Sequence, residues 1–292
     1  MMDTQQLYVT YKPLLFSIAY RMLGTVADAE DIVQDTFLSL EKFQKKNVEN
    51  VKAWLCKILT NRCIDFLRSA RKKREVYVGP WLPEPVVFRD EQLGPMEQLI
   101  HQDQLSIAML ALIESLSPVE RAIFILREVL DFEYDEIAEI TGKETANCRK
   151  IFSRVKQKLS KELPDQRIDY EQQKLLLESF LKAIHTEDSA TLLELLSPDV
   201  ILYSDGGGKV KAALRPILSS ERVIAFLLGI TRKQSPDYRV EIGNVNGEAG
   251  IIAYEGDEIY GISTIKLVNG KIAALYFIRN PDKLKNSWTT RG

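Results

Sequence analysis

Three stretches of this chain have the residue types needed to bind charged partners. Residues 26–40 carry carboxylates and an amide but no basic residue. In contrast, residues 52–74 contain eight basic residues and one acidic residue, and residues 143–161 contain seven and one. An acidic surface attracts a basic protein partner, whereas clustered Lys and Arg attract a polyanion such as nucleic acid. The net charge of −2 averages over these stretches and hides them.

The composition is that of a folded protein with more than one domain. At 292 residues the chain is longer than one hydrophobic core normally supports, and its 45% hydrophobic and 27% charged residues are ordinary for globular proteins. Cys56, Cys63 and Cys148 lie in apolar patterns without paired spacing, which predicts reduced core thiols and no zinc site. The sequence has no basic-then-apolar leader and no run of roughly 18 apolar residues. We therefore expect a cytoplasmic protein.

Apolar residues at helical spacing predict a compact unit in the first quarter of the chain. The pattern over Leu7–Leu40 indicates two helices joined near Gly24. A third helix is expected over about Asn50–Arg71, and the unit ends near Glu75. The acidic stretch falls on the second of these helices and the first basic stretch on the third.

Residues 77–95 interrupt the helical pattern with several prolines and a glycine, which indicates a linker. The linker nevertheless contains Trp81, Leu82 and the apolar run 86–88. A free linker should not expose such side chains to water. We therefore expect part of it to dock on a folded surface.

A second helical unit is predicted after the linker. Ser117 followed by Pro118 fits a helix start, and Gly142 fits a turn between helices. Glu144 caps poorly, so the start of the last helix is not fixed by its capping residue. The expected helices are Met96–Ser115, Val119–Leu130, Tyr134–Thr141 and Glu144–Leu159.

The last of these helices has a basic outer face. A short helix, a glycine turn and a longer basic helix form a helix-turn-helix, whose second helix enters the major groove of DNA. There Asn147 can bind adenine, and Arg149 or Lys150 can bind guanine, whereas the later cations suit phosphates. The alternative is a charged face that only covers a small core. The outer face comprises Asn147, Arg149, Lys150, Ser153, Arg154 and Lys156.

After Pro164 the pattern changes to a mixture of helices and strands. Asn246 with Gly247 and Asn269 with Gly270 are strong hairpin signals. We therefore expect an α+β domain with a curved antiparallel sheet, which makes the chain multidomain, with two all-α units first. The expected helices are Tyr170–His185, Ser189–Leu196 and Glu221–Leu228, and the expected strands are Arg239–Val245, Ala249–Tyr254, Ile259–Val268 and Lys271–Ile278.

The first 163 residues resemble the two conserved domains of an extracytoplasmic-function (ECF) sigma factor, and the tail resembles a SnoaL-like domain of the NTF2 fold. That order, with the motifs at 81–85, 205–209 and 280–284, resembles the ECF41 group. The resemblance implies a sigma-70 region 2 domain at 4–75, a linker at 76–95, a region 4 helix-turn-helix domain at 96–163 and an NTF2-like cone domain at 168–292.

The resemblance also implies roles for the charged faces of region 2. Asp31, Gln34 and Asp35 match the positions that dock on the β′ clamp helices of core RNA polymerase, while region 4 would meet the β flap. An open −10 element presents flipped bases, and the Asn61 amide can both donate to and accept from a base edge. Solvated helix faces are the alternative. The residues implied for the −10 region are Asn61, Arg62, Asp65, Arg68, Arg71, Lys72, Lys73 and Arg74.

Two further motifs are implied to be regulatory. The glycines of the first permit positive φ and close backbone approach, and the segment lacks phosphate-loop spacing; a plain hairpin turn is its alternative. The second follows the last strand, and we expect residues from 280 onward to contact the linker or the first domain; a simple C-terminal cap is its alternative. The motifs comprise Asp205, Gly206, Gly207, Gly208 and Lys209, and Asn280, Pro281, Asp282, Lys283 and Leu284.

The main hypothesis is a dissociable promoter-recognition subunit that binds core RNA polymerase and promoter DNA, with no catalytic residue, cofactor or metal. Its SnoaL-like domain would modulate activity, and a small ligand in that domain's cavity is left open. The competing class is a SnoaL-like cyclase or isomerase fused to a DNA-binding module, with His185, Asp199, Asp205 and Asp257 as the available acid and base groups. His185 fits a helix end better than a base. A third hypothesis is a ligand-sensing regulator without polymerase, against which the acidic helix argues.

Overall fold

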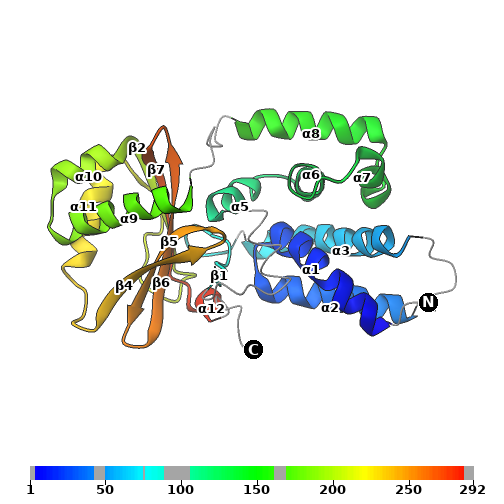
Figure 1. The fold of residues 1–292 in the computed structure, drawn as a ribbon, viewed down its shortest axis with the longest axis horizontal. Helices are drawn as coiled ribbons and strands as arrows, with labels where there is room; N and C mark the ends of the chain where they lie inside the picture. The colour runs from blue at the N-terminus through cyan, green and yellow to red at the C-terminus, as the bar shows by residue number, and fades with distance from the viewer. Residues whose placement is uncertain (1–3, 43–49, 75, 89–105, 161–168, 286–292) are drawn as a thin grey trace. The chain divides into compact units, whose positions relative to one another are not determined.

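The computed structural model describes residues 4–42, 50–74, 76–88, 106–160 and 169–285, with the side chains of 4, 42 and 70–74 excepted. Its contacts divide the chain into two compact units, which we treat separately (Figure 1). The helical unit contains the described residues up to 76 and those of 109–160. The sheet unit contains 77–88, 106–108 and 169–285. The linker residues 77–88 therefore belong with the C-terminal domain rather than with the helices that they follow.

Three helices open the helical unit: α1 (Thr4–Leu23), α2 (Val26–Lys42) and α3 (Val51–Arg74). The predicted break at Gly24 is confirmed: this residue has a φ of 75°, and its N–H donates to the Tyr20 carbonyl at 2.7 Å. The third helix runs three residues past the predicted end, because its basic last turn continues without a helix breaker. Cys56 and Cys63 are free, buried thiols, as predicted.

The remaining helices are α5 (Ile107–Ile113), α6 (Pro118–Phe124), the π-helix η1 (Ile125–Val129), α7 (Tyr134–Thr141) and α8 (Thr145–Ser160). The predicted start at Ser117 is confirmed by a capping box with Glu120. The single helix predicted over Val119–Leu130 is wrong in its second half, which widens into a π turn with the Leu130 N–H bonded to the Ile125 carbonyl at 3.2 Å. Apolar spacing alone does not distinguish the two helix types. The first half of the helix predicted over Met96–Ser115 lies outside the described residues, and the second half contains α5.

The helix-turn-helix and the first three helices pack into the same unit. Helices α6 and α7 contact α3. The buried Arg121 of α6 donates to the Met22 carbonyl of α1 at 2.6 Å and pairs with the Glu114 carboxylate at 3.0 Å. Burial lowers the pKa of Arg121 to about 10. Two predicted domains thus share part of their interior.

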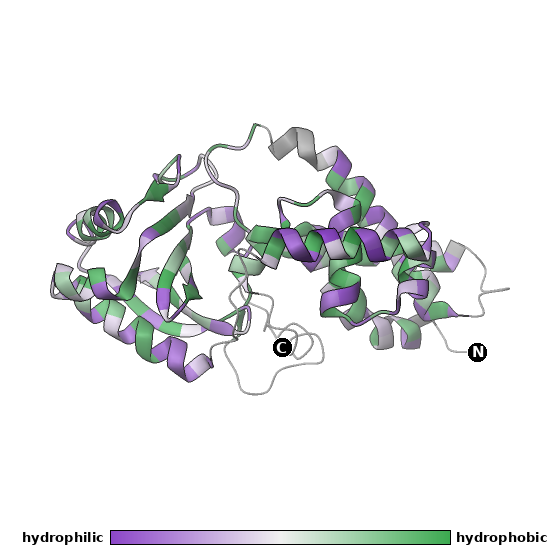
Figure 2. Cartoon of the chain, turned by 90° about the horizontal axis from the view of Figure 1, so that it is seen from above, coloured by the Kyte–Doolittle hydropathy of each residue, from purple (hydrophilic) through white to green (hydrophobic). Residues whose placement is uncertain are grey.

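The sheet unit has α9 (Tyr170–His185), α10 (Ser189–Leu195) and α11 (Ser220–Thr231) on one face of a seven-stranded sheet (Figure 1). The strand order is β1-β4-β5-β6-β7-β2-β3. Leu177, Phe180, Leu202 and Leu275 lie in the core between helices and sheet. Hydrophobic residues are frequent on the strands and on the helices that cover them (Figure 2), and in β5 every residue from Ala249 to Tyr254 is buried. The strands are β1 (Val87–Phe88), β2 (Leu196–Asp205), β3 (Ile217–Leu218), β4 (Tyr238–Val245), β5 (Glu248–Glu255), β6 (Glu258–Val268) and β7 (Lys271–Ile278).

Both predicted hairpins are confirmed, and one expectation about the sheet is wrong. Asn246 and Gly247 have φ of 54° and 85°, and Asn269 and Gly270 have 52° and 75°. However, β2 pairs with β7 in parallel, so the sheet is mixed rather than antiparallel. Strand β2 was not predicted, and a pairing between strands this far apart in sequence leaves no turn signal between them.

The linker docks, as predicted. Strand β1 extends the sheet at the β4 edge, with Val87 opposite Val245 and Phe88 opposite Asn244. Leu82 and Val86 are buried as well. Linker residues 89–95 lie outside the described residues. Within the part of the chain that is described, no helix has the length and apolarity to cross a membrane.

Candidate functional site

Helix α2 presents the predicted acidic face to solvent. Asp31, Gln34 and Asp35 are all exposed, while Val33 and Phe37 point into the core. Leu38 lies on the same face, seven residues after Asp31, and its exposed fraction is 52%. Leu38 therefore adds apolar area to a face that otherwise carries carboxylates and an amide. Leu38 was not predicted as part of this face, although its helical spacing from Asp31 could have signalled it.

The polar face of α3 lies beside this acidic face. Asn61, Asp65 and Arg68 are exposed, and Arg68 pairs with Asp65 at 3.2 Å. Arg62 is half-buried and binds back to α2, pairing with Asp35 at 3.3 Å and donating to the Ser39 hydroxyl at 2.8 Å. One residue predicted for DNA and one predicted for polymerase therefore contact each other.

One of the predicted −10 residues, Asn61, contacts the helix-turn-helix. The Asn61 amide donates to the Ile140 carbonyl of α7 at 3.5 Å, the long limit for a hydrogen bond. Nearby, the Lys52 ammonium lies 4.9 Å from the centre of the Phe132 ring. The last turn of α3 belongs to the described backbone, but the side chains of Arg71, Lys72, Lys73 and Arg74 lie outside the described residues.

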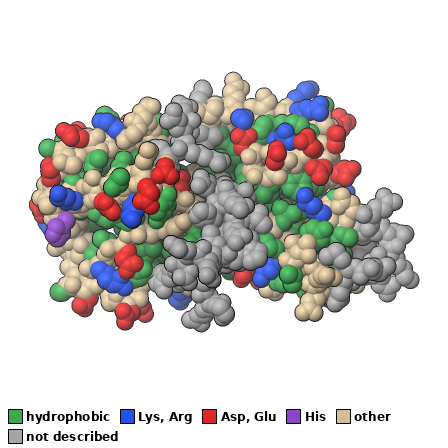
Figure 3. All heavy atoms as spheres, viewed as in Figure 1, with side chains coloured by type: hydrophobic (Ala, Val, Ile, Leu, Met, Phe, Trp, Pro, Cys, Tyr) green, Lys and Arg blue, Asp and Glu red, His purple; other side chains and the backbone are tan. Residues whose placement is uncertain are grey.

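The outer face of α8 divides into open and paired residues. All six predicted residues are exposed, while Cys148 faces the interior. Arg154 pairs with Glu120 at 2.8 Å and Lys156 with Glu128 at 2.9 Å, and acidic and basic side chains lie side by side over this region (Figure 3). Among the described residues, no ion pair involves Arg149 or Lys150. The first two turns of α8 are therefore the part most available to a polyanion. Asn147 is exposed there too, and Ser153 is exposed at the start of the third turn.

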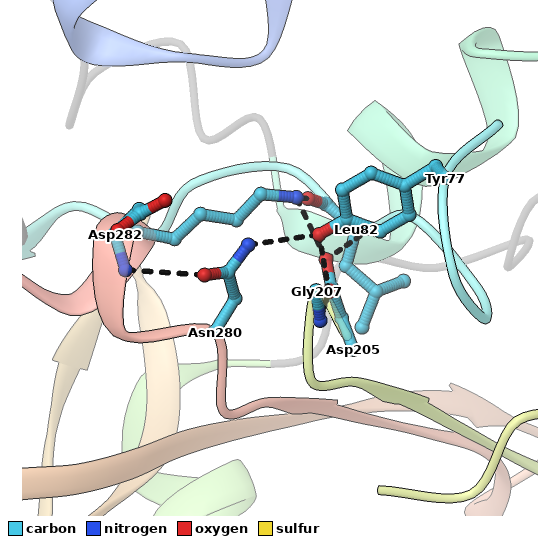
Figure 4. A network of polar contacts seen from close by, with 7 residues as sticks. Tyr77, Leu82, Asp205, Gly207, Asn280 and Asp282 are labelled. Carbon is cyan, nitrogen blue, oxygen red and sulfur yellow. Dashed lines mark hydrogen bonds and ion pairs between the residues drawn. The ribbon is translucent and has the colours of Figure 1, made fainter. Parts of the chain in front are cut away.

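In the sheet unit, one buried carboxylate gathers both regulatory motifs and the linker (Figure 4). Asp205 ends β2 with none of its surface exposed. Its Oδ1 accepts from the Tyr77 hydroxyl at 2.6 Å and the Gly207 N–H at 3.0 Å. Its Oδ2 accepts from the Leu82 N–H at 2.9 Å and the Lys283 ammonium at 2.7 Å. Four donors satisfy the charge that burial would otherwise penalise.

Helix α12 (Pro281–Leu284) supplies the other side of this cluster. Lys283 also donates to the Leu82 carbonyl, and its ammonium lies 4.2 Å from the centre of the Trp81 ring. Asn280 caps α12 through Asp282, and its amide donates to the Tyr77 hydroxyl at 2.9 Å. We call Tyr77, Leu82, Asp205, Asn280 and Lys283 the linker clamp. Burial and the Asp205 carboxylate raise the pKa of Tyr77 well above its usual range, so its hydroxyl stays a donor.

The glycines of the first motif make this approach possible. Gly207 has a φ of 60°, and a Cβ there would lie 2.6 Å from the Asn280 Cγ. A Cβ on Gly208 would lie 3.1 Å from the Val78 Cβ. Lys209 adds a surface ion pair with Asp282. The segment begins the long loop that connects the antiparallel strands β2 and β3, and it contains a turn in which the Lys209 N–H donates to the Gly206 carbonyl at 3.0 Å.

A second attachment holds the linker at the β4–β5 turn. The Val86 N–H donates to the Asn246 side chain at 2.9 Å, and the Asn246 N–H donates to the Val86 carbonyl at 2.8 Å. Asn246 is fully buried. The sequence analysis identified Asn246 only as a turn residue and did not single out Tyr77. No local pattern signals these roles, because each depends on a partner more than a hundred residues away.

The acid and base groups considered for an enzyme do not come together. His185 is the exposed last residue of α9, Asp199 accepts from the neighbouring Ser197, and Asp257 is exposed in the β5–β6 turn. Asp205 is occupied by the linker clamp. Across the described ranges, no three His, Cys, Asp or Glu side chains are grouped in a way that could hold a metal ion.

Comparisons with known proteins assign both helical regions to one family. Residues 7–73 match the family profile of Sigma-70 region 2, and residues 106–159 match that of Sigma-70, region 4. The chain is 32% identical over 288 residues to the ECF RNA polymerase sigma factor SigJ of Mycobacterium tuberculosis, covering 94% of this chain and 90% of the relative. It is 25% identical to the probable ECF sigma factor SigI of the same species, covering 94% and 92%. The crystal structure of M. tuberculosis SigJ matches with a TM-score of 0.78 and 30% identity, covering 96% of this chain and 98% of SigJ.

The matches to both sigma-70 regions define the chain as a promoter-recognition subunit of RNA polymerase. The chain belongs to the ECF RNA polymerase sigma factors. Its sheet unit is a C-terminal domain of the NTF2-like fold. Sigma factors are not enzymes, and they act with core RNA polymerase and promoter DNA.

Proposed function

We propose that this sigma factor binds polymerase through α2 and promoter DNA through α3 and α8, and that its C-terminal domain restrains it by holding the linker. The observation that carries the proposal is the buried Asp205 carboxylate, which binds Tyr77, Leu82 and Lys283 together. A linker that only connected two domains would not need a buried charge to hold it.

The polymerase contact is the α2 face formed by Asp31, Gln34, Asp35 and Leu38. Carboxylates favour encounter with a basic partner and fix its register. An exposed Leu at the edge of such a face adds apolar area that water would otherwise cover. This combination suits docking on the β′ clamp helices of core polymerase, as the family resemblance implies.

The DNA contacts are Asn61 on α3 for the −10 element and the first two turns of α8 for the −35 element. In the described arrangement the Asn61 amide is directed at the Ile140 carbonyl, and α7 packs on α3. A base edge that needs the same amide would have to displace this contact. We therefore infer that the helical unit opens when −10 DNA is read, which makes the described arrangement a resting state.

The linker couples this opening to the C-terminal domain through its length. Residues 77–88 follow region 2 in the chain and precede region 4. While the linker clamp and Asn246 hold these residues, the separation of their ends is fixed. A fully extended chain spans about 3.4 Å per residue, so once released the segment can lengthen to at most about 40 Å. The C-terminal domain thus limits how far the two DNA-binding regions separate.

The proposal assigns the C-terminal domain no reaction, cofactor or ligand. It acts by binding the linker, because the acid and base groups available for catalysis are exposed and apart or, in the case of Asp205, already engaged. The domain affects transcription because the held and released states of the linker differ in free energy, and that difference sets how often the linker is released.

The test compares two asparagines in equivalent turns. Asn246 and Asn269 both precede a glycine and have φ of 54° and 52°, but only Asn246 holds the linker. We expect Asn246→Ala to increase hydrogen exchange in the peptide 77–88 and to increase transcription by reconstituted holoenzyme. Asn269→Ala should change neither. Faster exchange of the linker without any change in transcription would contradict the proposed restraint.

A further inference from the structure

We propose that Tyr134, the first residue of α7, positions the Arg149 guanidinium of α8 for reading a base edge in the −35 element. Tyr134 would be a positioning residue, because its ring acts on DNA only through Arg149. The inference rests on the proposed −35 role of α8 and adds a residue that no DNA contact would reveal.

The ring of Tyr134 lies at the centre of a small cluster. The Arg149 guanidinium carbon is 5.4 Å from its centroid, and that of Arg127 is 5.0 Å away. The Phe152 ring meets it edge to face, with centroids 6.0 Å apart and planes at 74°. Tyr134 is half-buried, whereas Arg149 is exposed. The ring is thus packed on its own domain while the guanidinium beside it faces solvent.

The two arginines differ in what else binds them. Arg127 donates to the Phe132 carbonyl at 2.8 Å and pairs with Glu133 at 3.3 Å and Asp131 at 3.6 Å. Within the described residues, Arg149 lies beside the ring of Tyr134 and pairs with no carboxylate. Arg127 therefore belongs to the framework of the domain, whereas Arg149 is a solvent-facing cation next to an aromatic ring.

This kind of contact suits a residue that must read DNA. The attraction to a ring uses the charge of the guanidinium rather than its N–H groups, so the donors stay available to a hydrogen-bonding partner. A bidentate contact to guanine needs two of those donors in one plane. In contrast, Arg154 and Lys156 use their donors on Glu120 and Glu128. Among the described cations of α8, Arg149 combines an aromatic neighbour with donors that no ion pair uses.

The platform is fixed relative to α8 by the turn between the two helices. Helix α7 ends at Gly142 in the left-handed conformation, with a φ of 64°. The Thr145 hydroxyl at the start of α8 donates to Asp135 of α7 at 2.8 Å. Tyr134 neighbours Asp135 in the same first turn of α7, so its ring holds a defined position beside the recognition helix.

The experiment measures base preference rather than overall activity. Reconstituted holoenzyme transcribes a promoter library in which each −35 position carries each of the four bases. We expect Arg149→Ala to abolish the preference at one position. Tyr134→Leu should weaken the preference at that same position about two- to five-fold, the range for an exposed cation–π contact, and leave other positions unchanged. Tyr134→Phe should retain the preference, and Arg149→Ala with Tyr134→Leu should match Arg149→Ala alone.

A purely structural role for Tyr134 would lower transcription from every library member equally, and that result would overturn the proposal. Additive losses in the double variant would do the same. If Arg149→Ala changes no preference, the −35 role of Arg149 fails as well; if only the Tyr134 variants lack the effect, the positioning role alone fails. Should thermal melting show Tyr134→Leu to be unfolded, Tyr134→Met provides the same test, because its side chain fills space beside Phe152.

Discussion

Lys283→Met is the substitution that should most directly release the linker. The Lys283 side chain is 7% exposed and that of Asp205 is 0% exposed, so the variant leaves a buried carboxylate without its cation. Breaking one side of a buried pair costs about 3–5 kcal/mol. The hydrogen bonds from Tyr77, Leu82 and Gly207 to Asp205 remain, so we expect a value of about 3 kcal/mol.

Hydrogen exchange followed by mass spectrometry measures this effect on the peptide 77–88. At 1.4 kcal/mol for each tenfold change, a loss of about 3 kcal/mol raises the exchange rate of the Leu82 amide about 100-fold. Lys285→Met is the matched control, since Lys285 is exposed two residues further along. Adding Asp205→Asn to Lys283→Met should cost less than the sum of both changes, because no unpaired charge is then buried.

The reasoning is refuted if Lys283→Met leaves the linker as protected as in the parent chain while thermal melting shows a folded protein. It is also refuted if Lys285→Met releases the linker equally. Either result would mean that the buried pair does not hold residues 77–88.

Three other predictions concern the C-terminal domain and helix α2. Gly207→Ala should lower the free energy of unfolding of the C-terminal domain more than Gly256→Ala, by about 1–3 kcal/mol, because both have φ near 60° but only Gly207 faces a close neighbour; chemical denaturation measures both. Burial raises the pKa of Glu248 to about 7, so the native state keeps a proton that the unfolded chain releases at lower pH. Unfolding free energy should therefore fall as pH rises towards 7, and Glu248→Gln should flatten that dependence. Asp31→Asn should weaken binding to core polymerase several-fold in a fluorescence titration, whereas Glu30→Gln, off the exposed face of the same helix, should not.

Local patterns predicted most of the elements of this fold. The Asn246 and Asn269 turns were predictable because two residues with positive φ favour Asn followed by Gly. The C-terminal end of α7 was predictable because Gly142 adopts the left-handed conformation that stops a helix. Such signals act over a few residues and do not depend on the rest of the molecule.

Features that depend on distant partners were not predictable in the same way. The parallel pairing of β2 with β7 joins strands separated by most of the C-terminal domain. Lys156 looked free for phosphate on its helix, but its partner Glu128 lies on the π turn, which apolar spacing had not revealed. The sequence indicated that the motif containing Asp205 was important, yet the roles of Tyr77 and Asn246 emerged only from the folded linker.

Hydrogen exchange of the Leu82 and Val86 amides, measured in the free chain and again in holoenzyme with core RNA polymerase on promoter DNA, tests the account most directly. Both amides donate to side chains of the C-terminal domain in the free chain, so we expect slow exchange there. The account predicts a large increase in their exchange rates in the promoter-bound holoenzyme. Equal protection in the two states would contradict it, because the sigma factor would then be fully engaged with its linker still held.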